Sequence, residues 1–326
     1  MSIKIGIVMD PLPSINIKKD STFAMMLAAQ KLGWEIHTIY QADLYTRNEQ
    51  ARAFSRTTLV DDNPDNWFNF SSKQDIALDS LDVILMRKDP PFDIEYIATS
   101  YILELAERAG SLVVNKPASL RDFNEKMFIT LFPQCCTPFM VAQDTKRLRD
   151  FVEQRFRAEQ QDVILKPLDG MGGTSIYRVN PHDPNLSVIL ETVSENDSRT
   201  VMAQQFIPDI IHGDKRVLLI DGEAVPYALA RIPAEGETRG NLAAGGSGVG
   251  IELSERDHWI CQQVAPVLKQ QGILFAGIDI IGDYLTEINI TSPTCIRELD
   301  QIYSLDIAGD LMRNIEKHLT RKTSDK

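Results

Sequence analysis

Several residue types are scarce in this sequence, and each shortage narrows the class of protein. The 326-residue chain has four cysteines and five histidines, and none of them follows a metal-binding or Cys-x-x-Cys spacing. We therefore expect the histidines to be structural. Cys135, Cys136, Cys261 and Cys295 indicate reduced thiols in a cytoplasmic protein rather than a disulfide framework.

Basic residues and long apolar runs are also in short supply. The chain has 34 Lys and Arg against 46 Asp and Glu, a net charge of −12, which argues against a general nucleic-acid-binding surface. No run reaches the roughly 18 apolar residues of a membrane helix, and the first ten residues are too short and too acidic at their end for a signal peptide. The sequence thus predicts neither a nucleic-acid nor a membrane partner.

Strand and helix patterns alternate over the first 120 residues. Apolar runs at 3–9, 35–40, 83–86 and 112–114 are typical of buried strands, and amphipathic segments at 21–32 and 94–109 are typical of helices. This alternation predicts a parallel sheet with helices on both faces. The stretch from about residue 50 to 79 is polar and irregular, and we predict no regular structure there.

The pattern changes near residue 122, where we place a domain boundary. A helix is expected from Asn124, which is a suitable cap. Asp221-Gly222 separates apolar strands at 215–220 and 223–230, and Gly282-Asp283 separates strands at 275–281 and 285–290. Such turns predict two antiparallel hairpins, so the second part of the chain is expected to be α+β.

The second hairpin carries three oxygen-bearing side chains, those of Asp279, Glu287 and Asn289. Residues two apart on a strand share a face, and the expected turn sets Asp279 opposite Glu287 on that face. Hard divalent cations such as Mg²⁺ favour ligands of this kind. The alternative is a solvated sheet face with ordinary acidic residues.

Lys166 ends an apolar strand and is followed by a loop containing Gly170, Gly172 and Gly173. Glycines allow backbone N–H groups to approach phosphate oxygens closely. The loop is neither a Walker A motif nor G-x-G-x-x-G, and the chain has no G-x-S-x-G elbow. A phosphate-binding loop is one interpretation, and a flexible surface loop is the other.

Three further segments have a functional and a plain interpretation. Residues 202–208 run from a strand into an irregular segment. The backbone groups of this segment either bind the edge of an adenine or belong to a simple strand end. The glycine-rich loop 232–248, with Arg239, is either a mobile lid over anionic ligands or disordered. Arg87 follows a parallel strand, where it either holds a substrate carboxylate or forms a loop salt bridge.

Taken together, these motifs resemble the ATP-grasp superfamily of carboxylate–amine ligases, and within it the bacterial glutathione synthetase family. The resemblance is carried by residues 5–11 (IGIVMDP), 87–93 (RKDPPFD), 166–173 (KPLDGMGG), 237–246 (ETRGNLAAGG) and 286–295 (TEINITSPTC). These motifs span almost the whole chain, in order.

The resemblance implies an organisation and a reaction. An N-terminal α/β substrate domain (1–122) is expected to precede an ATP-grasp lid subdomain (123–203) and a catalytic domain (204–320) with the mobile loop 232–248. The reaction would join γ-glutamylcysteine to glycine with ATP, through an acyl phosphate, giving glutathione, ADP and phosphate. A pair of Mg²⁺ ions, with Mn²⁺ as a substitute, and a cytoplasmic homotetramer are implied as well.

The resemblance also implies roles for individual residues. ATP phosphates would meet Lys126, Lys166, Gly172 and Gly173, adenine would meet Gln204, Gln205, Phe206 and Ile207, and the ribose would meet Asp214. Arg216, Arg231, Arg239 and Lys166 would act on the reacting groups, and Asp279, Glu287 and Asn289 would hold the metal, with Asn289 also near ATP. Arg87, Asn241, Ser292, Arg231 and Arg239 would orient the substrates.

Two other functions are compatible with this fold. Another ATP-grasp ligase, such as a D-alanine–D-alanine ligase or a glutamate-adding protein ligase, would share the lysines and the metal hairpin but not the lid sequence. A nucleotide-binding regulatory protein, as synapsin-like proteins are, would keep the fold without ligating. The retained Asp279, Glu287 and Asn289 argue against the regulatory protein, and the missing glycine fingerprint argues against a nicotinamide dehydrogenase.

Overall fold

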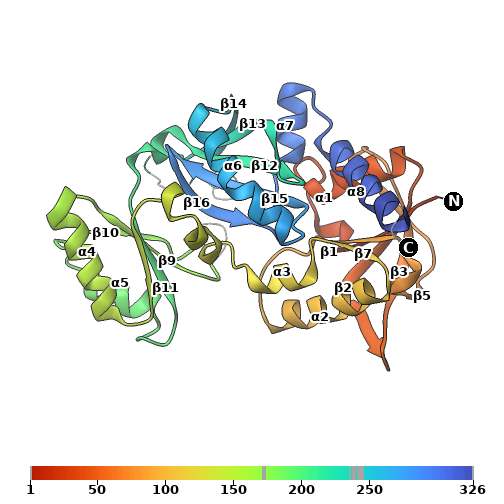
Figure 1. Ribbon diagram of the computed structural model, residues 1–326, viewed down its shortest axis with the longest axis horizontal. Helices are drawn as coiled ribbons and strands as arrows, with labels where there is room; N and C mark the ends of the chain where they lie inside the picture. The colour runs from red at the N-terminus through yellow and green to blue at the C-terminus, as the bar shows by residue number, and fades with distance from the viewer. Residues whose placement is uncertain (1, 171–173, 235, 237–239, 241–245, 325–326) are drawn as a thin grey trace.

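Three β-sheets make up the fold, and they follow one another along the long axis of the molecule (Figure 1). The structure is a computed structural model that describes residues 2–170, 174–234, 236, 240 and 246–324. None of the helices in these ranges combines the length and apolar character that crossing a bilayer requires. The expected mixture of α/β and α+β architecture is confirmed.

The first sheet has a parallel centre, as predicted. β1 (Lys4–Met9) lies between β2 (Glu35–Arg47) and β6 (Val83–Met86), and β7 (Leu112–Val114) pairs with β6. Alternate residues of β1 pack on opposite faces: Ile5 and Ile7 belong to the core that includes α1 (Ser21–Lys31), and Val8 belongs to the core that includes α2 (Ile94–Ala109). Helices therefore cover both faces of this sheet.

Local capping fixes where these two helices begin and end. The Asp20 side chain accepts a hydrogen bond from the Phe23 amide at 2.6 Å, and the Asp93 side chain accepts one from Tyr96 at 2.9 Å. At the end of α2, Gly110 has a φ of 121°, a conformation that suits glycine. The predicted helix positions are confirmed.

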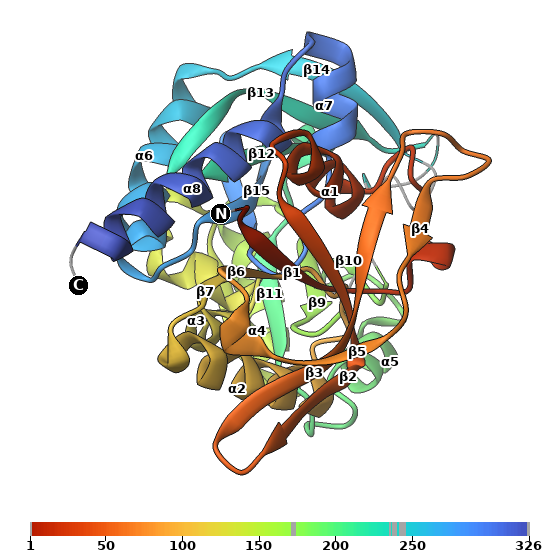
Figure 2. The same ribbon diagram turned by 90° about the vertical axis from the view of Figure 1, so that its right-hand side faces the viewer.

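The prediction of an irregular stretch at residues 50–79 is wrong. This stretch forms β3 (Gln50–Val60), β4 (Phe68–Phe70) and β5 (Gln74–Ala77), which extend the first sheet in antiparallel fashion. The residues that β3 buries include Ala51, Ala53 and Ser55, which are small, so the apolar alternation is weak in the sequence. The β2–β3 hairpin projects from the body of the protein (Figure 2).

The second sheet lies at the opposite end of the molecule from the first (Figure 1). It is antiparallel, with the order β10-β9-β11-β8, and packs against α4 and α5. Its elements are β8 (Phe139–Ala142), α4 (Thr145–Glu159), β9 (Val163–Pro167), β10 (Tyr177–Val179), α5 (Leu186–Val193) and β11 (Val201–Gln205).

The helix expected from Asn124 forms as a short 3₁₀ helix and not as an α-helix. Asn124 Oδ1 does accept from the amides of Lys126 and Met127, at 3.0 and 3.1 Å, but only a 3₁₀ helix at Met127–Leu131 follows. Pro133 starts a second 3₁₀ turn, because proline cannot continue the hydrogen-bonding of a helix. Other 3₁₀ turns lie at Leu12–Ser14, Leu78–Ser80 and Pro208–His212.

The third sheet lies between the other two and contains both predicted hairpins (Figure 1). Its antiparallel order is β14-β13-β12-β15-β16. The strands are β12 (Asp214–Ile220), β13 (Glu223–Ile232), β14 (Ser247–Glu252), β15 (Phe275–Ile281) and β16 (Tyr284–Asn289), and the nearby helices are α3 (Pro117–Asp122), α6 (Glu255–Gln270), α7 (Ile296–Tyr303) and α8 (Ile307–Ser324). α8 packs on α1, so the chain returns to the first sheet.

Candidate active site

A cavity of about 490 Å³ lies where the three sheets meet. Lys19, Asp89 and Pro90 line it from the N-terminal part of the chain, and the second and third sheets supply most of the rest. The predicted site residues among its lining are Lys166, Gln204, Gln205, Phe206, Ile207, Asp214, Arg216, Arg231, Asp279, Glu287, Asn289 and Ser292. Residues far apart in the sequence are thus brought together at one site.

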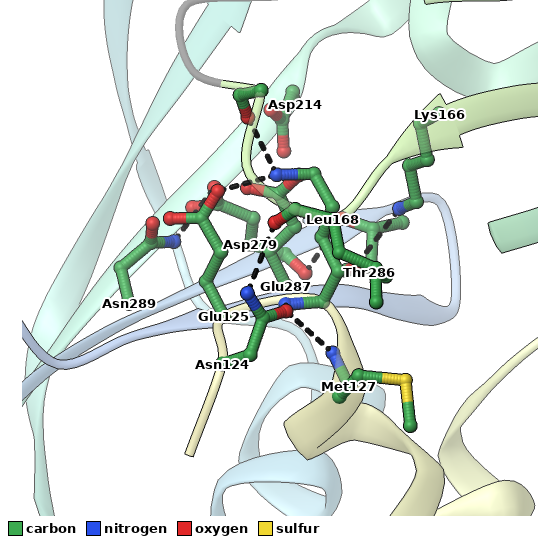
Figure 3. A network of polar contacts seen from close by, with 12 residues as sticks. Asn124, Glu125, Met127, Lys166, Leu168, Asp214, Asp279, Thr286, Glu287 and Asn289 are labelled. Carbon is green, nitrogen blue, oxygen red and sulfur yellow. Dashed lines mark hydrogen bonds and ion pairs between the residues drawn. The ribbon is translucent and has the colours of Figure 1, made fainter. Parts of the chain in front are cut away.

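The β15–β16 hairpin brings its three oxygen-bearing side chains to this cavity. Asp279 is paired with Glu287 in the strand register, as the turn position predicts. Asn289 Nδ2 donates to Asp279 Oδ2 at 3.2 Å, so its side chain lies on the same face. Figure 3 shows Asp279, Glu287 and Asn289 converging, with Asp214 and Lys166 approaching from neighbouring elements.

Two arginines hold Asp279 in place. Arg216 forms a two-pronged ion pair with this carboxylate, with Nη2 donating to Oδ2 at 2.8 Å and Nε donating to Oδ1. Arg231 Nη2 lies 2.9 Å from the same Oδ2 and also pairs with Asp214. Two cations and two anions are therefore packed together, with every partner at most 6% exposed except the partly buried Asp214.

This arrangement gives Asp279 and Asp214 very different pKa values. Burial alone would raise the pKa of Asp279, but Arg216 and Arg231 outweigh it and lower that pKa to about 2. Burial raises the pKa of Asp214 to about 7; Arg231 opposes the rise, and the nearby charge of Asp279 adds to it. Asp279 is thus a permanent anion, whereas Asp214 exchanges a proton near neutral pH.

The two predicted phosphate lysines are both buried but differ in their partners. Lys166 Nζ donates to the Thr286 carbonyl at 3.2 Å, and burial lowers its pKa. Lys126 Nζ donates to the Gly170 carbonyl at 2.7 Å, pairs with Glu125 and lies 3.7 Å from Glu287. Burial would lower the pKa of Lys126, but the two glutamates reverse the effect and raise it.

The segment expected to meet adenine presents two side-chain amides to the cavity, and two of its backbone donors are already paired. The Gln205 and Phe206 N–H groups already donate to the Pro138 and Asp162 carbonyls, both at 2.9 Å. Gln204 Nε2 and Gln205 Oε1 are buried and find no hydrogen-bond partner among the residues that the structure describes. One unpaired donor and one unpaired acceptor therefore stand at this end of the cavity.

Arg87 lies behind the cavity wall. Its Nη2 donates to the Pro293 carbonyl at 3.0 Å and its Nε donates to Thr22 Oγ1 at 3.1 Å. Ser292, which lines the cavity, donates through Oγ to the Arg87 carbonyl at 3.3 Å. Arg87 Nη1 is buried and has no hydrogen-bond partner within the described ranges. Arg87 thus supports the Ser292-Pro293 wall and keeps one N–H group unpaired.

Some predicted residues lie outside the described part of the chain, and some lining residues were not predicted. Gly172, Gly173, Arg239 and Asn241 are in the first group, together with most of the loop 232–248. Glu125, Thr286 and Glu298 are in the second. Glu125 adjoins the predicted Lys126, so proximity in sequence is a signal for it, whereas Glu298 has no such signal.

The hairpin donors suit a hard divalent cation. Two carboxylates and one amide oxygen are typical ligands of Mg²⁺ or Mn²⁺ and leave positions for phosphate oxygens and water. In the described residues, no three His, Cys, Asp or Glu side chains gather at one metal position. The hairpin set consists of two carboxylates and the amide of Asn289. Asp279 is already engaged by two arginines, which leaves Glu287 and Asn289 as the more available donors.

Family models match nearly the whole chain. The prokaryotic glutathione synthetase N-terminal domain matches residues 3–121, and the ATP-grasp domain of the same family matches residues 125–304. The chain is 58% identical to a glutathione synthetase of Pseudomonas syringae pv. tomato over 319 residues, covering 98% of each. It is 58% identical to a glutathione synthetase of Yersinia pestis over 321 residues, covering 98% of this chain and 99% of that protein.

Solved structures share the fold at low sequence identity. A D-cycloserine synthetase, DcsG, superposes with a TM-score of 0.67 at 14% identity, covering 97% of this chain and 99% of that one. The D-alanyl-alanine synthetase A of Vibrio cholerae gives a TM-score of 0.58 at 14% identity, covering 98% and 99%. These similarities concern the fold alone.

Proposed function

This chain belongs to the prokaryotic glutathione synthetase family, and on that premise we propose a role for each residue group of its cavity. The protein catalyses the ATP-dependent ligation of γ-glutamylcysteine to glycine, which gives glutathione, ADP and phosphate through an acyl phosphate. A carboxylate is a poor electrophile at neutral pH, so the γ-phosphoryl group of ATP first activates it. The glycine amine then attacks the acyl phosphate, and phosphate leaves.

Charge stabilisation is the role we assign to Arg216 and Arg231. Phosphoryl transfer depends mainly on positioning and on neutralising charge, and buried guanidinium groups supply fixed positive charge without reorganisation. Both arginines line the cavity beside Asp279, where they are held before any substrate arrives. They would stabilise first the transferred phosphoryl group and then the tetrahedral oxyanion. We assign the same role to Arg239 because it lies in the motif at residues 237–246.

ATP binding is assigned to residues from the second and third sheets. Lys166 and Lys126 would contact phosphates, with Gly172, Gly173 and Asn289 beside them. The unpaired amide atoms of Gln204 and Gln205 would hydrogen-bond the adenine, with Phe206 and Ile207 completing its pocket. Asp214, which retains an unpaired buried oxygen among the described residues, would accept from the ribose.

Enzymes of this family require divalent metal ions. We assign a pair of Mg²⁺ ions, replaceable by Mn²⁺, to Glu287, Asn289 and Asp279. When bound, the metal would supply positive charge that neutralises the ATP phosphates. Glu287 and Asn289 would hold it directly, and the two arginines keep Asp279 ionised beside it.

The substrates are ATP, γ-glutamylcysteine and glycine. Arg87, Ser292, Arg231, Arg239 and Asn241 are the residues we assign to orienting the peptide and glycine. The unpaired Nη1 of Arg87 and its support of the Ser292-Pro293 wall favour this assignment. Ser292 lines the cavity directly.

Three broader features belong to the same proposal. We assign residues 1–122 to a substrate domain, 123–203 to a lid subdomain and 204–320 to a catalytic domain with the loop 232–248 as a mobile lid. We assign the protein to the cytoplasm, which supplies ATP and maintains the four free cysteines as thiols. A homotetramer is the assembly we expect in solution.

The observation that carries these assignments is the convergence of Asp279, Glu287 and Asn289 with Arg216 and Arg231 at one cavity. The test is ADP release in a coupled assay with γ-glutamylcysteine, with and without glycine. We expect release only when both substrates are present. Activity with D-alanine alone would identify another ATP-grasp ligase, and ATP binding without turnover on any amine would identify a regulatory protein.

A further inference from the structure

The residues assigned to the ATP phosphates and those assigned to the metal belong to two different sheets. The glycine-rich loop starts at residue 168, directly after β9 of the second sheet, and the metal hairpin is β15–β16 of the third. Strand register within either sheet therefore does not fix the distance from this loop to the metal ligands. Phosphoryl transfer depends on such distances, so the contacts that bridge the two sheets matter for the reaction.

Two of the bridging contacts are made by lysines. Lys166 Nζ donates to the Thr286 carbonyl on the hairpin at 3.2 Å. Lys126 Nζ donates to the Gly170 carbonyl in the loop at 2.7 Å. Both ammonium groups are assigned to ATP phosphates, so a bound triphosphate would compete with the two carbonyl groups for these donors. A contact outside this competition would hold the loop equally well with and without ATP.

The side chain of Asn124 makes such a contact. Its Nδ2 donates to the Leu168 carbonyl at 3.0 Å, at the start of the loop. Its Oδ1 accepts from the amides of Lys126 and Met127 at 3.0 and 3.1 Å. Figure 3 shows the two ends of this amide pointing towards Leu168 and Met127. Asn124 does not line the cavity formed by the described residues, so ATP would not compete for its amide.

The residue after Asn124 is fixed to the metal hairpin. The Ile288 amide donates to the Glu125 carbonyl at 2.9 Å. Ile288 lies on β16 between Glu287 and Asn289, the two more available metal donors. One short segment therefore carries a backbone hydrogen bond to the hairpin and, from the neighbouring residue, a side-chain hydrogen bond to the loop.

We propose that Asn124 is a positioning residue, whose amide sets the distance between the loop at residues 168–170 and the metal hairpin and so aligns the ATP phosphates with the metal. This inference rests on the proposed function, which takes the loop as phosphate-binding and the hairpin as metal-binding. The position needs an acceptor for two amides and a donor for the Leu168 carbonyl, and a primary amide supplies both. An ionised aspartate supplies only acceptors, and serine has a single polar atom.

The test measures the dissociation constants of ADP and of adenosine, in the presence of Mg²⁺, by calorimetry on Asn124→Asp and Asn124→Ser. Both replacements keep an oxygen that can cap the segment, and both remove the amide donor. ADP would meet the loop through its phosphates, whereas adenosine would meet only the pocket at residues 204–207 and the ribose site. We expect both variants to bind ADP about 3-fold to 10-fold more weakly, which corresponds to one hydrogen bond, and to bind adenosine as the wild type does.

Steady-state kinetics should show the same selectivity. KM for ATP should rise by about 3-fold to 10-fold, and kcat should fall by about 10-fold because the phosphates are misaligned with the metal. KM values for γ-glutamylcysteine and glycine should not change. Asn180→Asp and Asn180→Ser are the matched controls: Asn180 follows β10, and its Oδ1 accepts from the His182 amide at 2.9 Å, so the same replacements alter a capping asparagine outside the cavity lining of the described residues.

The outcomes separate this positioning role from the function on which it rests. An unchanged affinity for ADP in Asn124→Ser, or equal losses of affinity for ADP and adenosine, would overturn the role and leave the ligase function intact. A loss confined to Asn124→Asp would assign the effect to the added charge and would also overturn it. The binding measurements need no turnover. Absence of wild-type turnover with γ-glutamylcysteine and glycine would overturn the proposed function together with the inference that rests on it.

Discussion

Arg216 donates to both carboxylate oxygens of Asp279, and neither residue is more than 6% exposed. The strand register makes this pairing possible, since Arg216 on β12 lies directly opposite Asp279 on β15. Arg231 on β13 reaches the same carboxylate. One acid is thereby fixed between two cations that face the substrate cavity.

The first prediction concerns Asp279→Asn. The asparagine is nearly the same size, but it leaves the buried guanidinium of Arg216 without its anion and removes one of the two anionic partners of Arg231. Breaking a buried ion pair in this way typically costs about 3–5 kcal/mol. We expect a decrease of that order in the free energy of unfolding, measured with urea, and a loss of turnover. Asp283→Asn, at the exposed turn of the same hairpin, is the control. Equal stabilities of the two variants would contradict the prediction.

The second prediction concerns Glu287→Gln. Among the described residues, the ion pair of Glu287 is a long one, 3.7 Å to Lys126 Nζ, so removing its charge should leave the fold intact. We expect a loss of about 100-fold in metal-dependent turnover, because one anionic metal ligand becomes neutral. Turnover against Mg²⁺ concentration is the measurement, and far-UV circular dichroism checks the fold.

Glu223→Gln, which changes an exposed glutamate on β13, is the matched control for this experiment. An unchanged Mg²⁺ requirement in Glu287→Gln would remove this residue from the metal site. An equal loss in the control would show that the change in net charge, and not the site, matters.

The sequence predicts that the side chains of the β15–β16 hairpin share one face, but it predicts less of the rest of the cavity. A two-residue period and one turn suffice to set Asp279 opposite Glu287. The strands at residues 50–79 were missed because β3 buries small residues, which give weak periodicity. Glu298 was missed because α7 and the segment before α1 meet only through tertiary packing, which no local pattern reports.

The third prediction concerns pH and Asp214. Its pKa is about 7 in the folded protein, against an ordinary value of 3.8, so between those pH values the folded state holds a proton that the unfolded chain has released. The contribution of Asp214 to the free energy of unfolding therefore decreases as the pH rises from about 4 towards about 7. Asp279 remains ionised above about pH 5 and does not contribute to this change.

Asp214→Asn should remove this dependence. Urea unfolding at about pH 5 and about pH 8 should show a larger loss of stability in the wild type than in the variant. The comparison uses the difference between two pH values, so the constant cost of breaking the pair with Arg231 cancels. Identical pH dependence in both proteins would mean that Asp214 does not titrate in this range.

The last prediction concerns Asn115, which ties the first sheet to the metal hairpin. Its Nδ2 donates to the Phe275 and Ile290 carbonyls, both at 2.7 Å, and its Oδ1 accepts from the Leu274 and Phe275 amides at 2.8 and 2.9 Å. Phe275 begins β15, and Ile290 follows the end of β16. A single buried amide therefore joins both strands of the hairpin at its base.

Asn115→Asp keeps the shape and the acceptor oxygen but replaces the donor with an anion that faces two carbonyl groups. Each buried group left unsatisfied costs about 1–3 kcal/mol, so the free energy of unfolding should fall by about 2 kcal/mol or more. Because the base of the hairpin loosens, the Mg²⁺ concentration needed for half-maximal turnover should rise in the fraction that remains folded. Asn66→Asp, in an exposed turn, controls for the added charge. A variant as stable as the wild type, with an unchanged Mg²⁺ requirement, would show that strand pairing alone positions Asp279 and Glu287.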